Sequence, residues 1–375
     1  MMKRMLTISC VVGFLLIGAN SSGPAHAGST GLHTDLIHTG TLAETSSVSD
    51  DLYPVIIGEN QIGFIDAGGN AIEGLVYNQN ELGTDLFIEG LIGVKQGKLW
   101  GFADRTGKLV IPPKYQDIRS FSSGRAAAKA NNKWGFINRA GKWVVQPTYR
   151  EVQDFHEGRA AVKINKSWGY IDLNGSLIVK AKFKAAGQFS EGLAGVQVND
   201  TLLVYIDKNG REVIRYPAAP FGTLEAGPFR NGAAAIVING NSVFYIDKTG
   251  KLIFDKGQDP EYRHFLSDWP DFSEGLAGVK NSKYAYQKYG FIDTTGKFAI
   301  KPAYDFVKPF HNGLAAVSLN DKWGYVNKQG KVVIPIQYDN ADDFKGELAM
   351  VSRNGQIMYI GKQGQRVWTF AYPTP

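Results

Sequence analysis

The sequence has one cysteine and six histidines among 375 residues, and it has none of the common catalytic motifs. A disulfide framework needs several cysteines, and a structural zinc site needs clustered cysteine and histidine ligands, so the composition argues against both. The patterns G-x-G-x-x-G, G-x-S-x-G, G-x-x-x-x-G-K-[ST] and H-E-x-x-H are absent. We therefore expect a protein that is not an enzyme and needs no metal or cofactor.

Long apolar runs are also missing, except at the N-terminus. Two basic residues precede an apolar run from Met5 to about Ala19, and Ala25-His26-Ala27 follows. This order is typical of a secretory signal peptide, which we assign to residues 1–27. The run has about 15 residues, whereas a membrane-spanning helix needs about 20, so a retained anchor is the less favoured alternative. We expect a secreted, periplasmic or cell-surface protein with no membrane span in the mature chain.

The net charge of the chain is also small. Cleavage would remove Lys3 and Arg4 and no acidic residue, so the net charge would fall from +6 to +4. That charge is too dilute for a protein that contacts many phosphates, so we expect no nucleic-acid partner. Residues 28–50 are rich in Ser, Thr and Gly and show no period, which predicts a flexible leader before a folded domain at 51–375.

The folded domain contains an internal repeat. Its clearest copies are Lys-Trp-Gly-Phe-Ile-Asn at 133–138, Ser-Trp-Gly-Tyr-Ile-Asp at 167–172 and Lys-Trp-Gly-Tyr-Val-Asn at 322–327. We call the Trp position of each copy its anchor; the nine anchors have a basic period of 34 residues and are Ile62, Trp100, Trp134, Trp168, Leu203, Val243, Tyr289, Trp323 and Ile357. A Gly stands seven residues after every anchor: Gly69, Gly107, Gly141, Gly175, Gly210, Gly250, Gly296, Gly330 and Gly364. Such spacing is typical of repeat architectures.

These motifs resemble the WG-repeat, or KWG-repeat, proteins of bacteria over residues 51–372. An aromatic residue fifteen positions after most anchors and a Phe-x-x-Gly ahead of the next copy complete the pattern. Only four copies keep Trp-Gly, and the copies at 203, 243 and 357 lack both residues. The resemblance implies a repetitive β-structure in exported or envelope-associated proteins, with binding or scaffolding as the role and no catalytic residues to transfer.

The strand pattern independently predicts an all-β fold. Residues 313–319, 323–327 and 331–335 are short β-rich runs separated by polar pairs or Gly, which is the spacing of an antiparallel meander. Pro335 should end the third strand. Residues 338–344 are candidates for a short fourth, outer strand. We therefore expect about nine units of three to four strands in a β-propeller-like array, with an open β-solenoid as the alternative.

The Trp-Gly pair suggests how neighbouring units pack. Alternation places Trp134 and Phe136 on one face of a strand and Gly135 and Ile137 on the other. We expect the aromatic face of one unit to pack against the Gly hollow of the next, which makes Trp134 a core residue. The alternative is that the tryptophans form a platform on which sugars stack.

Two further repeat positions carry charge. Four residues after the anchor an Asp or Asn recurs, which predicts an Asx turn before the Gly; calcium binding is the alternative, although each turn offers only one carboxylate. Eight residues after the anchor a basic residue recurs in six copies: Lys108, Lys142, Arg211, Lys251, Lys297 and Lys331. If the units stack, the lysines form a positive stripe that attracts an anionic polymer; alternatively, they are solvated turn residues.

The longest insertion, residues 259–270, is the second candidate site. Insertions in repeat arrays often carry binding, and this one concentrates Tyr262, Arg263, His264 and Trp269. The alternative is a loop that covers the core of a degenerate repeat. The sequence thus predicts an exported, non-catalytic binding or scaffolding module of the cell envelope that engages a protein or an anionic or glycan polymer. A carbohydrate-active or other hydrolytic enzyme on a repeat scaffold is the alternative.

Overall fold

The computed structural model describes residues 51–58, 60–83, 87–200, 202–217, 224–238, 242–253, 272–280 and 288–370. The expected signal peptide (1–27), the expected leader (28–50) and the candidate residues Tyr262, Arg263, His264 and Trp269 lie outside the described residues.

The described residues form nine antiparallel sheets of three or four strands, numbered here as blades 1 to 9 in chain order. Blade 1 has β1 (Tyr53–Gly58), β2 (Gln61–Ile65) and β3 (Tyr77–Asn78), followed by the short 3-10 helix η2 (Gln79–Glu81). Blade 2 has β4 (Leu91–Gln96), β5 (Leu99–Asp104) and β6 (Leu109–Tyr115), and blade 3 has β7 (Asp117–Ser122), β8 (Arg125–Ala130), β9 (Lys133–Asn138) and β10 (Trp143–Tyr149).

The central blades are built in the same way. Blade 4 has β11 (Ala160–Ile164), β12 (Ser167–Ile171) and β13 (Leu177–Phe183); blade 5 has β14 (Ala185–Ala186), β15 (Leu193–Asn199), β16 (Leu202–Asp207) and β17 (Glu212–Pro217); blade 6 has β18 (Leu224–Ala226), β19 (Ala233–Ile238) and β20 (Ser242–Asp247).

The last three blades contain the C-terminal strands. Blade 7 has β21 (Leu276–Lys280), β22 (Tyr289–Asp293) and β23 (Phe298–Tyr304); blade 8 has β24 (Phe306–Val307), β25 (Leu314–Leu319), β26 (Lys322–Asn327) and β27 (Val332–Tyr338); blade 9 has β28 (Asn340–Ala341), β29 (Leu348–Arg353), β30 (Gln356–Gly361) and β31 (Arg366–Thr369).

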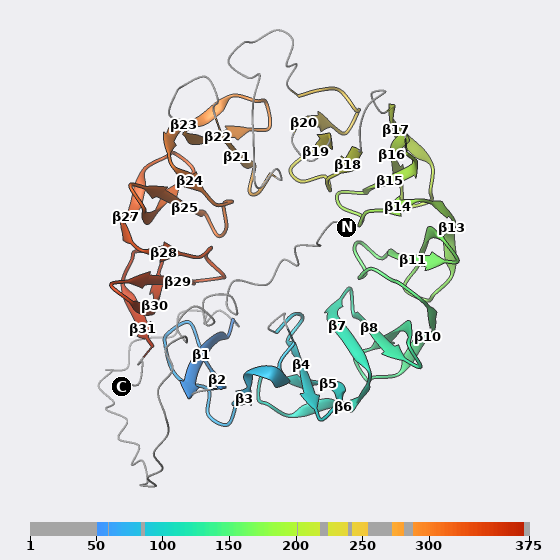
Figure 1. Ribbon diagram of the computed structural model, residues 1–375, viewed down its shortest axis with the longest axis horizontal. Helices are drawn as coiled ribbons and strands as arrows, with labels where there is room; N and C mark the ends of the chain where they lie inside the picture. Colours follow the sequence, from blue (N-terminus) through green and yellow to red (C-terminus); the bar gives the residue numbers. More distant parts are fainter. Residues whose placement is uncertain are drawn as a thin grey trace, which may run out of the picture. The chain divides into compact units, whose positions relative to one another are not determined.

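The blades follow one another around a ring, with the first strand of each blade innermost and the last outermost (Figure 1). The segment after Tyr338 therefore does not add a fourth, outer strand to its own blade, as the sequence suggested. Its strand β28 pairs with β29 and begins the next blade from the inside. The expected all-β, propeller-like array is confirmed, and no α-helix occurs among the described residues.

Contacts between the first and the last blade close the ring, which decides against the open solenoid. Residues of β1 and β2 share one buried cluster with residues of β29 and β30. The Tyr53 hydroxyl donates to the Lys345 carbonyl at 2.9 Å, and the Tyr359 hydroxyl donates to the Pro54 carbonyl at 3.0 Å. These partners lie some three hundred positions apart in the sequence, at the two ends of the repeat array.

Aromatic pairs join successive blades. The residue two positions after an anchor meets the Phe of the next Phe-x-x-Gly edge-to-face, with ring centroids 4.7 Å apart for Phe136 and Phe155 and 4.8 Å apart for Phe102 and Phe121. Both members of these pairs are buried. Edge-to-face geometry places the positive ring edge on the negative ring face and adds to the burial of the two rings. The Phe-x-x-Gly motif is therefore an inter-blade contact.

The Gly after the anchor accommodates the backbone of its own blade, so the expectation that it forms a hollow for the adjacent unit is wrong. A Cβ added to Gly135 would lie 2.4 Å from the Val145 carbonyl oxygen and 2.8 Å from Pro147 N. The outer strand bulges here, because Trp134 pairs with Tyr149 while Phe136 pairs with Val145. Four positions of the outer strand thus oppose two of the anchor strand.

The same bulge explains the prolines of the outer strands. Pro335 was expected to end its strand, but β27 continues through it to Tyr338. A bulged edge strand leaves positions without a ladder partner, and proline is tolerated at such positions. In the copy at 203, Val204 replaces Gly and pairs regularly with Arg215, so loss of the Gly accompanies loss of the bulge.

The second repeated Gly, seven positions after the anchor, packs closely against the neighbouring blade. A Cβ on Gly141 would lie 2.7 Å from Ile111 Cγ2 of the preceding blade, and one on Gly175 would lie 2.8 Å from Val145 Cγ2. Gly141 also has a φ of +67°, which glycine adopts without strain. At the ring closure, Gly69 of blade 1 approaches the Val367 carbonyl of blade 9 in the same way.

Candidate binding surfaces

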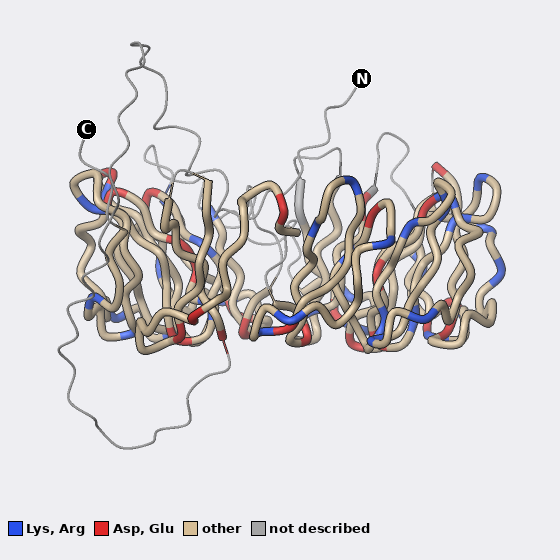
Figure 2. The backbone as a smooth tube through the Cα atoms, turned by 90° about the horizontal axis from the view of Figure 1, so that it is seen from below, with Lys and Arg blue, Asp and Glu red and all other residues tan. Residues whose placement is uncertain are grey.

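The strands of each blade end in turns on both faces of the ring, and the two faces differ in chemistry. We call them the turn edge and the tryptophan edge. The turn edge carries the Phe-x-x-Gly turns and the turns that contain the second conserved Gly. The tryptophan edge lies at the opposite end, where Trp134 is the second residue of β9, Tyr149 ends β10 and Lys129 lies near the end of β8. Lys and Arg occur in the turns at both ends of the strands (Figure 2).

The turn edge contains the expected Asx turns. The Asn138 side-chain oxygen accepts hydrogen bonds from the backbone N–H groups of Ala140 and Lys142 at 3.1 and 3.0 Å. The Asp104 carboxylate accepts the corresponding bonds from Thr106 and Lys108, and hydrogen bonding to Thr106 holds the pKa of Asp104 below its ordinary value. These Asp and Asn side chains therefore cap turns. No group of three or more potential metal-ligating side chains lies together among the described residues.

The five predicted stripe lysines lie on this turn edge, one per turn, and all are exposed: Lys108, Lys142, Lys251, Lys297 and Lys331. Their backbone N–H groups bond to the turn Asp or Asn. Within the part of the chain that the structure describes, none of their ammonium groups forms an ion pair with a carboxylate. The stripe remains a prediction.

Carboxylates of the Phe-x-x-Gly turns link neighbouring blades at the turn edge. Glu157 accepts a hydrogen bond from the Gly192 N–H at 2.9 Å and forms an ion pair with Lys208 at 3.0 Å, both in the next blade. Burial raises the pKa of Glu157, but these bonds outweigh it and hold the pKa below its ordinary value. Glu191 and Glu274 make the same contacts. The repeat Glu is therefore an inter-blade link.

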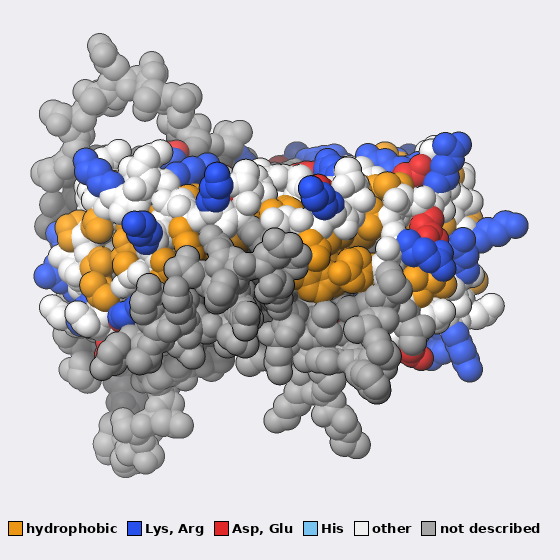
Figure 3. Space-filling view, turned by 90° about the horizontal axis from the view of Figure 1, so that it is seen from above, with side chains coloured by type: hydrophobic (Ala, Val, Ile, Leu, Met, Phe, Trp, Pro, Cys, Tyr) orange, Lys and Arg blue, Asp and Glu red, His pale blue; other side chains and the backbone are white. Residues whose placement is uncertain are grey.

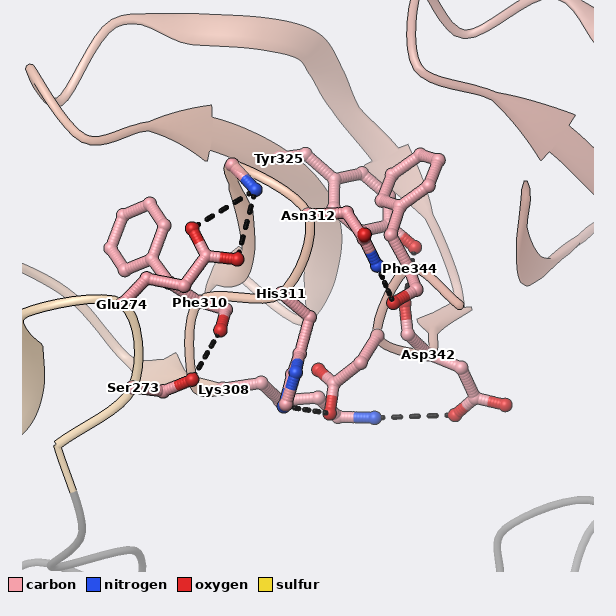
Figure 4. A network of polar contacts seen from close by, with 11 residues as sticks. Ser273, Glu274, Lys308, Phe310, His311, Asn312, Tyr325, Asp342 and Phe344 are labelled. Atoms are coloured by element: carbon pink, nitrogen blue, oxygen red, sulfur yellow. Dashed lines mark hydrogen bonds and ion pairs between the residues drawn. The ribbon is translucent and has the colours of Figure 1, made fainter. Parts of the chain in front are cut away.

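Blades 7 to 9 add a denser polar network (Figure 4). The Ser273 hydroxyl donates to the Phe310 carbonyl, and the Asn312 side-chain amide donates to the Phe344 carbonyl at 3.0 Å. Lys308 contacts Asp342 at 3.2 Å, and His311 contacts the adjacent Asp343 at 3.6 Å. Burial raises the pKa of Asp343 despite the nearby Lys308 and His311. Each contact joins one blade to the next, so the network is structural.

The prediction that Trp134 is a core residue is wrong, because the tryptophans are not core residues. Trp134 is half-buried, whereas Phe136, on the same face two positions later, is fully buried. Basic side chains lie over the indole ring: Lys129 Nζ is 5.6 Å from its centroid and Arg119 Cζ is 5.3 Å away. Lys95 over Trp100 at 5.4 Å and Lys163 over Trp168 at 5.5 Å repeat the arrangement. A basic residue five positions before the anchor was the sequence signal for these pairs.

The outermost strands expose pairs of aliphatic side chains: Leu109 and Val110, Leu177 and Ile178, and Val332 and Val333. On one side of the ring, exposed hydrophobic side chains alternate with single Lys and Arg side chains (Figure 3). Lysines on the same strands, such as Lys114 and Lys182, protect an exposed strand edge from pairing with another chain. No helix among the described residues is long and apolar enough to cross a membrane.

Comparisons with known proteins found a matching family and similar solved structures. The family described as WG containing repeat matches residues 100–134, 134–167, 168–201, 289–323 and 323–356. No curated protein sequence matches the chain. Among solved structures, a eukaryotic initiation factor is similar at 10% identity and a TM-score of 0.60, with 85% of this chain and 96% of that chain covered. BamB from Moraxella catarrhalis has 14% identity and a TM-score of 0.41, with 68% and 87% covered.

The five matching units are the five in which a Gly after the anchor meets the backbone of a bulged outer strand: Gly101, Gly135, Gly169, Gly290 and Gly324. The remaining units form blades without a Gly that meets the backbone of a bulged outer strand. The units that match the family are therefore the units in which the bulge requires a Gly. Residues 100–201 and 289–356 are therefore WG repeats, within a chain that has the fold of a β-propeller.

Proposed function

We propose that this protein is an exported binding or scaffolding module of the cell envelope, and that it holds an anionic or glycan polymer or an envelope protein without catalysing a reaction. The proposed export rests on the basic, apolar and small-residue pattern of residues 1–27. A hydrolytic enzyme on the same scaffold is the alternative, and it requires two carboxylates that face a bound glycan.

One observation carries the proposal: the repeat acids are engaged within the fold, whereas many repeat lysines are not. Asp104 and Asp172 cap turns, and Glu157 joins two blades. The exposed turn lysines, such as Lys142, form no ion pair among the described residues. An exposed surface with uncompensated positive charge attracts polyanions.

The test is a retention experiment with the mature protein. The protein is incubated with isolated cell walls, with extracellular glycans and with an envelope lysate, and the retained material is identified. The proposal expects a glycan, a cell-wall fraction or one envelope protein to retain it, with no release of shortened glycan fragments. Release of reducing ends by the purified protein would favour the hydrolase. Failure of all three materials to retain it would contradict the binding role.

A further inference from the structure

The basic residues are concentrated in three consecutive blades, although the whole chain is only mildly basic. Residues 91–186, which include every strand of blades 2 to 4, contain 18 Lys and Arg but only 6 Asp and Glu. The remainder of the sequence contains 23 Lys and Arg and 29 Asp and Glu. A charge difference of this size between parts of one chain points to an anionic partner for the basic part. The net charge of the whole chain conceals it.

Many of these cations lie at the tryptophan edge. The start of the strand that carries the anchor, or the turn before it, has an exposed or half-exposed lysine: Lys98 in blade 2, Lys133 in blade 3 and Lys166 in blade 4. Arg150, which follows the last strand of blade 3, is exposed at the same edge. None of these four cations forms an ion pair within the described part of the chain. They lie close in sequence to half-buried tryptophans with basic side chains over their rings.

Blade 8 has the same framework with its charge neutralised. Lys322 stands one residue before its anchor and forms an ion pair with Asp339, sixteen residues after it. Hydrogen bonding to Lys322 holds the pKa of Asp339 below its ordinary value. In blade 3 the two positions are occupied by Lys133 and Arg150, so a pair of opposite charges has become a pair of like charges. Like charges at adjacent exposed or half-exposed positions repel each other and favour a bound anion.

We propose that the tryptophan edge of blades 2 to 4 binds an anionic polysaccharide, a chain of sugar rings that carries carboxylate or phosphate groups at intervals. This inference rests on the proposed binding function and narrows it to one surface and one class of ligand. The lysine and tryptophan pair recurs once per blade in three successive blades. In blade 4 its lysine, Lys163, also forms an ion pair with Glu151 at 2.8 Å, so Lys166, which has no ion pair among the described residues, supplies the free charge there. The surface thus offers a series of similar basic subsites. A polymer with repeated charges meets such a series with many contacts at once, which raises its affinity through multivalency.

The geometry of the aromatic residues favours a polysaccharide over a single-stranded nucleic acid. Nucleic-acid channels leave aromatic ring faces free so that bases can stack on them. Here Lys95 lies over Trp100, and Lys129 and Arg119 lie over Trp134. These cations thus occupy positions that a stacking base needs. Lys95 and Lys129 present an ammonium group to a carboxylate or phosphate beside the indole, whereas Arg119 also contacts Asp154 at 3.9 Å.

The experiment compares two variants that lose the same amount of charge. The edge variant is Lys98→Gln, Lys133→Gln, Arg150→Gln and Lys166→Gln. The matched control is Arg211→Gln, Lys251→Gln, Lys297→Gln and Lys331→Gln, which removes four positive charges from the turn edge of blades 5 to 8. Thermal unfolding establishes that both variants are folded. Binding of the mature protein is measured against polygalacturonate, a phosphate-substituted mannan, a single-stranded oligonucleotide and neutral dextran.

The parent and the control should bind one or both charged polysaccharides, and the edge variant should bind them at least about ten-fold more weakly, since each basic residue near an anionic surface contributes roughly 1 kcal/mol. Binding should weaken as salt rises, and dextran should not bind. The carboxylate and phosphate probes distinguish the two sources of charge.

Several results would overturn the assignment. Equal binding by the edge variant and the parent would refute this surface while leaving the binding function intact. Loss of binding in the control would place the site on the turn-edge stripe. Tighter binding of the oligonucleotide would refute the polysaccharide, and retention of the parent by cell walls without binding to either charged polysaccharide would also do so. Failure of the parent to bind any probe, cell wall or envelope lysate would contradict the proposed function itself.

Discussion

Replacing Gly135 by Ala tests whether the Trp-Gly motif is explained by the bulge of its own blade. The added methyl would lie 2.4 Å from the Val145 carbonyl oxygen and 2.8 Å from both Gln146 C and Pro147 N. Backbone atoms cannot rotate away as the end of a flexible side chain can, so β10 must shift to make room. Overpacking of this kind typically costs about 1–3 kcal/mol. We expect the free energy of unfolding to fall by about that amount.

The assay is thermal or urea unfolding followed by tryptophan fluorescence, and the chain offers a matched control. A Cβ added to Gly83 would meet its nearest neighbour, Gly93, at 3.6 Å, which is ordinary contact. Gly83→Ala should therefore leave the midpoint unchanged or raise it slightly, because alanine restricts the unfolded chain. If Gly135→Ala unfolded at the same midpoint as Gly83→Ala, the bulge explanation would be wrong.

A rescue variant makes the same test sharper. Val204 occupies the Gly position of blade 5, and the outer strand opposite it pairs regularly, from Tyr216 with Leu203 to Ile214 with Tyr205. Combining Gly135→Val with deletion of Gln146 and Pro147 should convert blade 3 to this regular pairing. The deletion is expected to recover part of the stability that Gly135→Val alone loses. A deletion that made the Gly135→Val protein still less stable would contradict the link between Gly and bulge.

Three further outcomes follow from the packing and the charges. Phe136→Ala should cost about 3–5 kcal/mol as a fully buried aromatic, and Trp134→Ala should cost less because the indole is half-buried; unfolding midpoints check the order. Gly141→Ala should destabilise the protein through contact with Ile111 of the preceding blade, with hydrogen exchange increasing in both blades. The pKa of Glu157 is lowered in the fold, so its contribution is present above pH 4.5 and is lost as pH falls through the folded pKa; Glu157→Gln should flatten stability over that range.

Much of the architecture could be predicted from the sequence because the repeat imposes the same local chemistry nine times. The Asx turn at Asn138 needs only a side-chain oxygen and a Gly three residues later, so the spacing alone identifies it. The unit of three or four antiparallel strands follows in the same way from short β-rich runs between turns. Ring closure does not, because it depends on contacts such as Tyr53 with Lys345, whose partners share no local pattern.

The roles of the two repeated glycines were predicted wrongly from the sequence. Alternation correctly placed Trp134 and Phe136 on one face, but it gave no indication that the outer strand bulges opposite Gly135. A bulge depends on the pairing register of two strands, which a single sequence does not display. The inter-unit contact was therefore assigned to Gly135, whereas the structure gives it to Gly141.

The candidate surface was missed for a different reason. The net charge of the whole chain hides a basic segment, residues 91–186, because the rest of the chain is acidic. Counting charged residues over that segment separately would have revealed it. Pairing geometry supplied the rest, because an unpaired Lys133 and a paired Lys322 look alike in sequence. The insertion at 259–270 stays a prediction, since it lies outside the described residues.

Lysine footprinting is the most direct measurement of the central claim that the ring exposes one basic edge for an anionic polymer. The mature protein is acetylated briefly with and without polygalacturonate or the phosphate-substituted mannan, and modification is read at each lysine by mass spectrometry. The account predicts protection at Lys98, Lys133 and Lys166 and unchanged modification at Lys297 and Lys331. Protection confined to the last two lysines, or equal protection at all five, would contradict it.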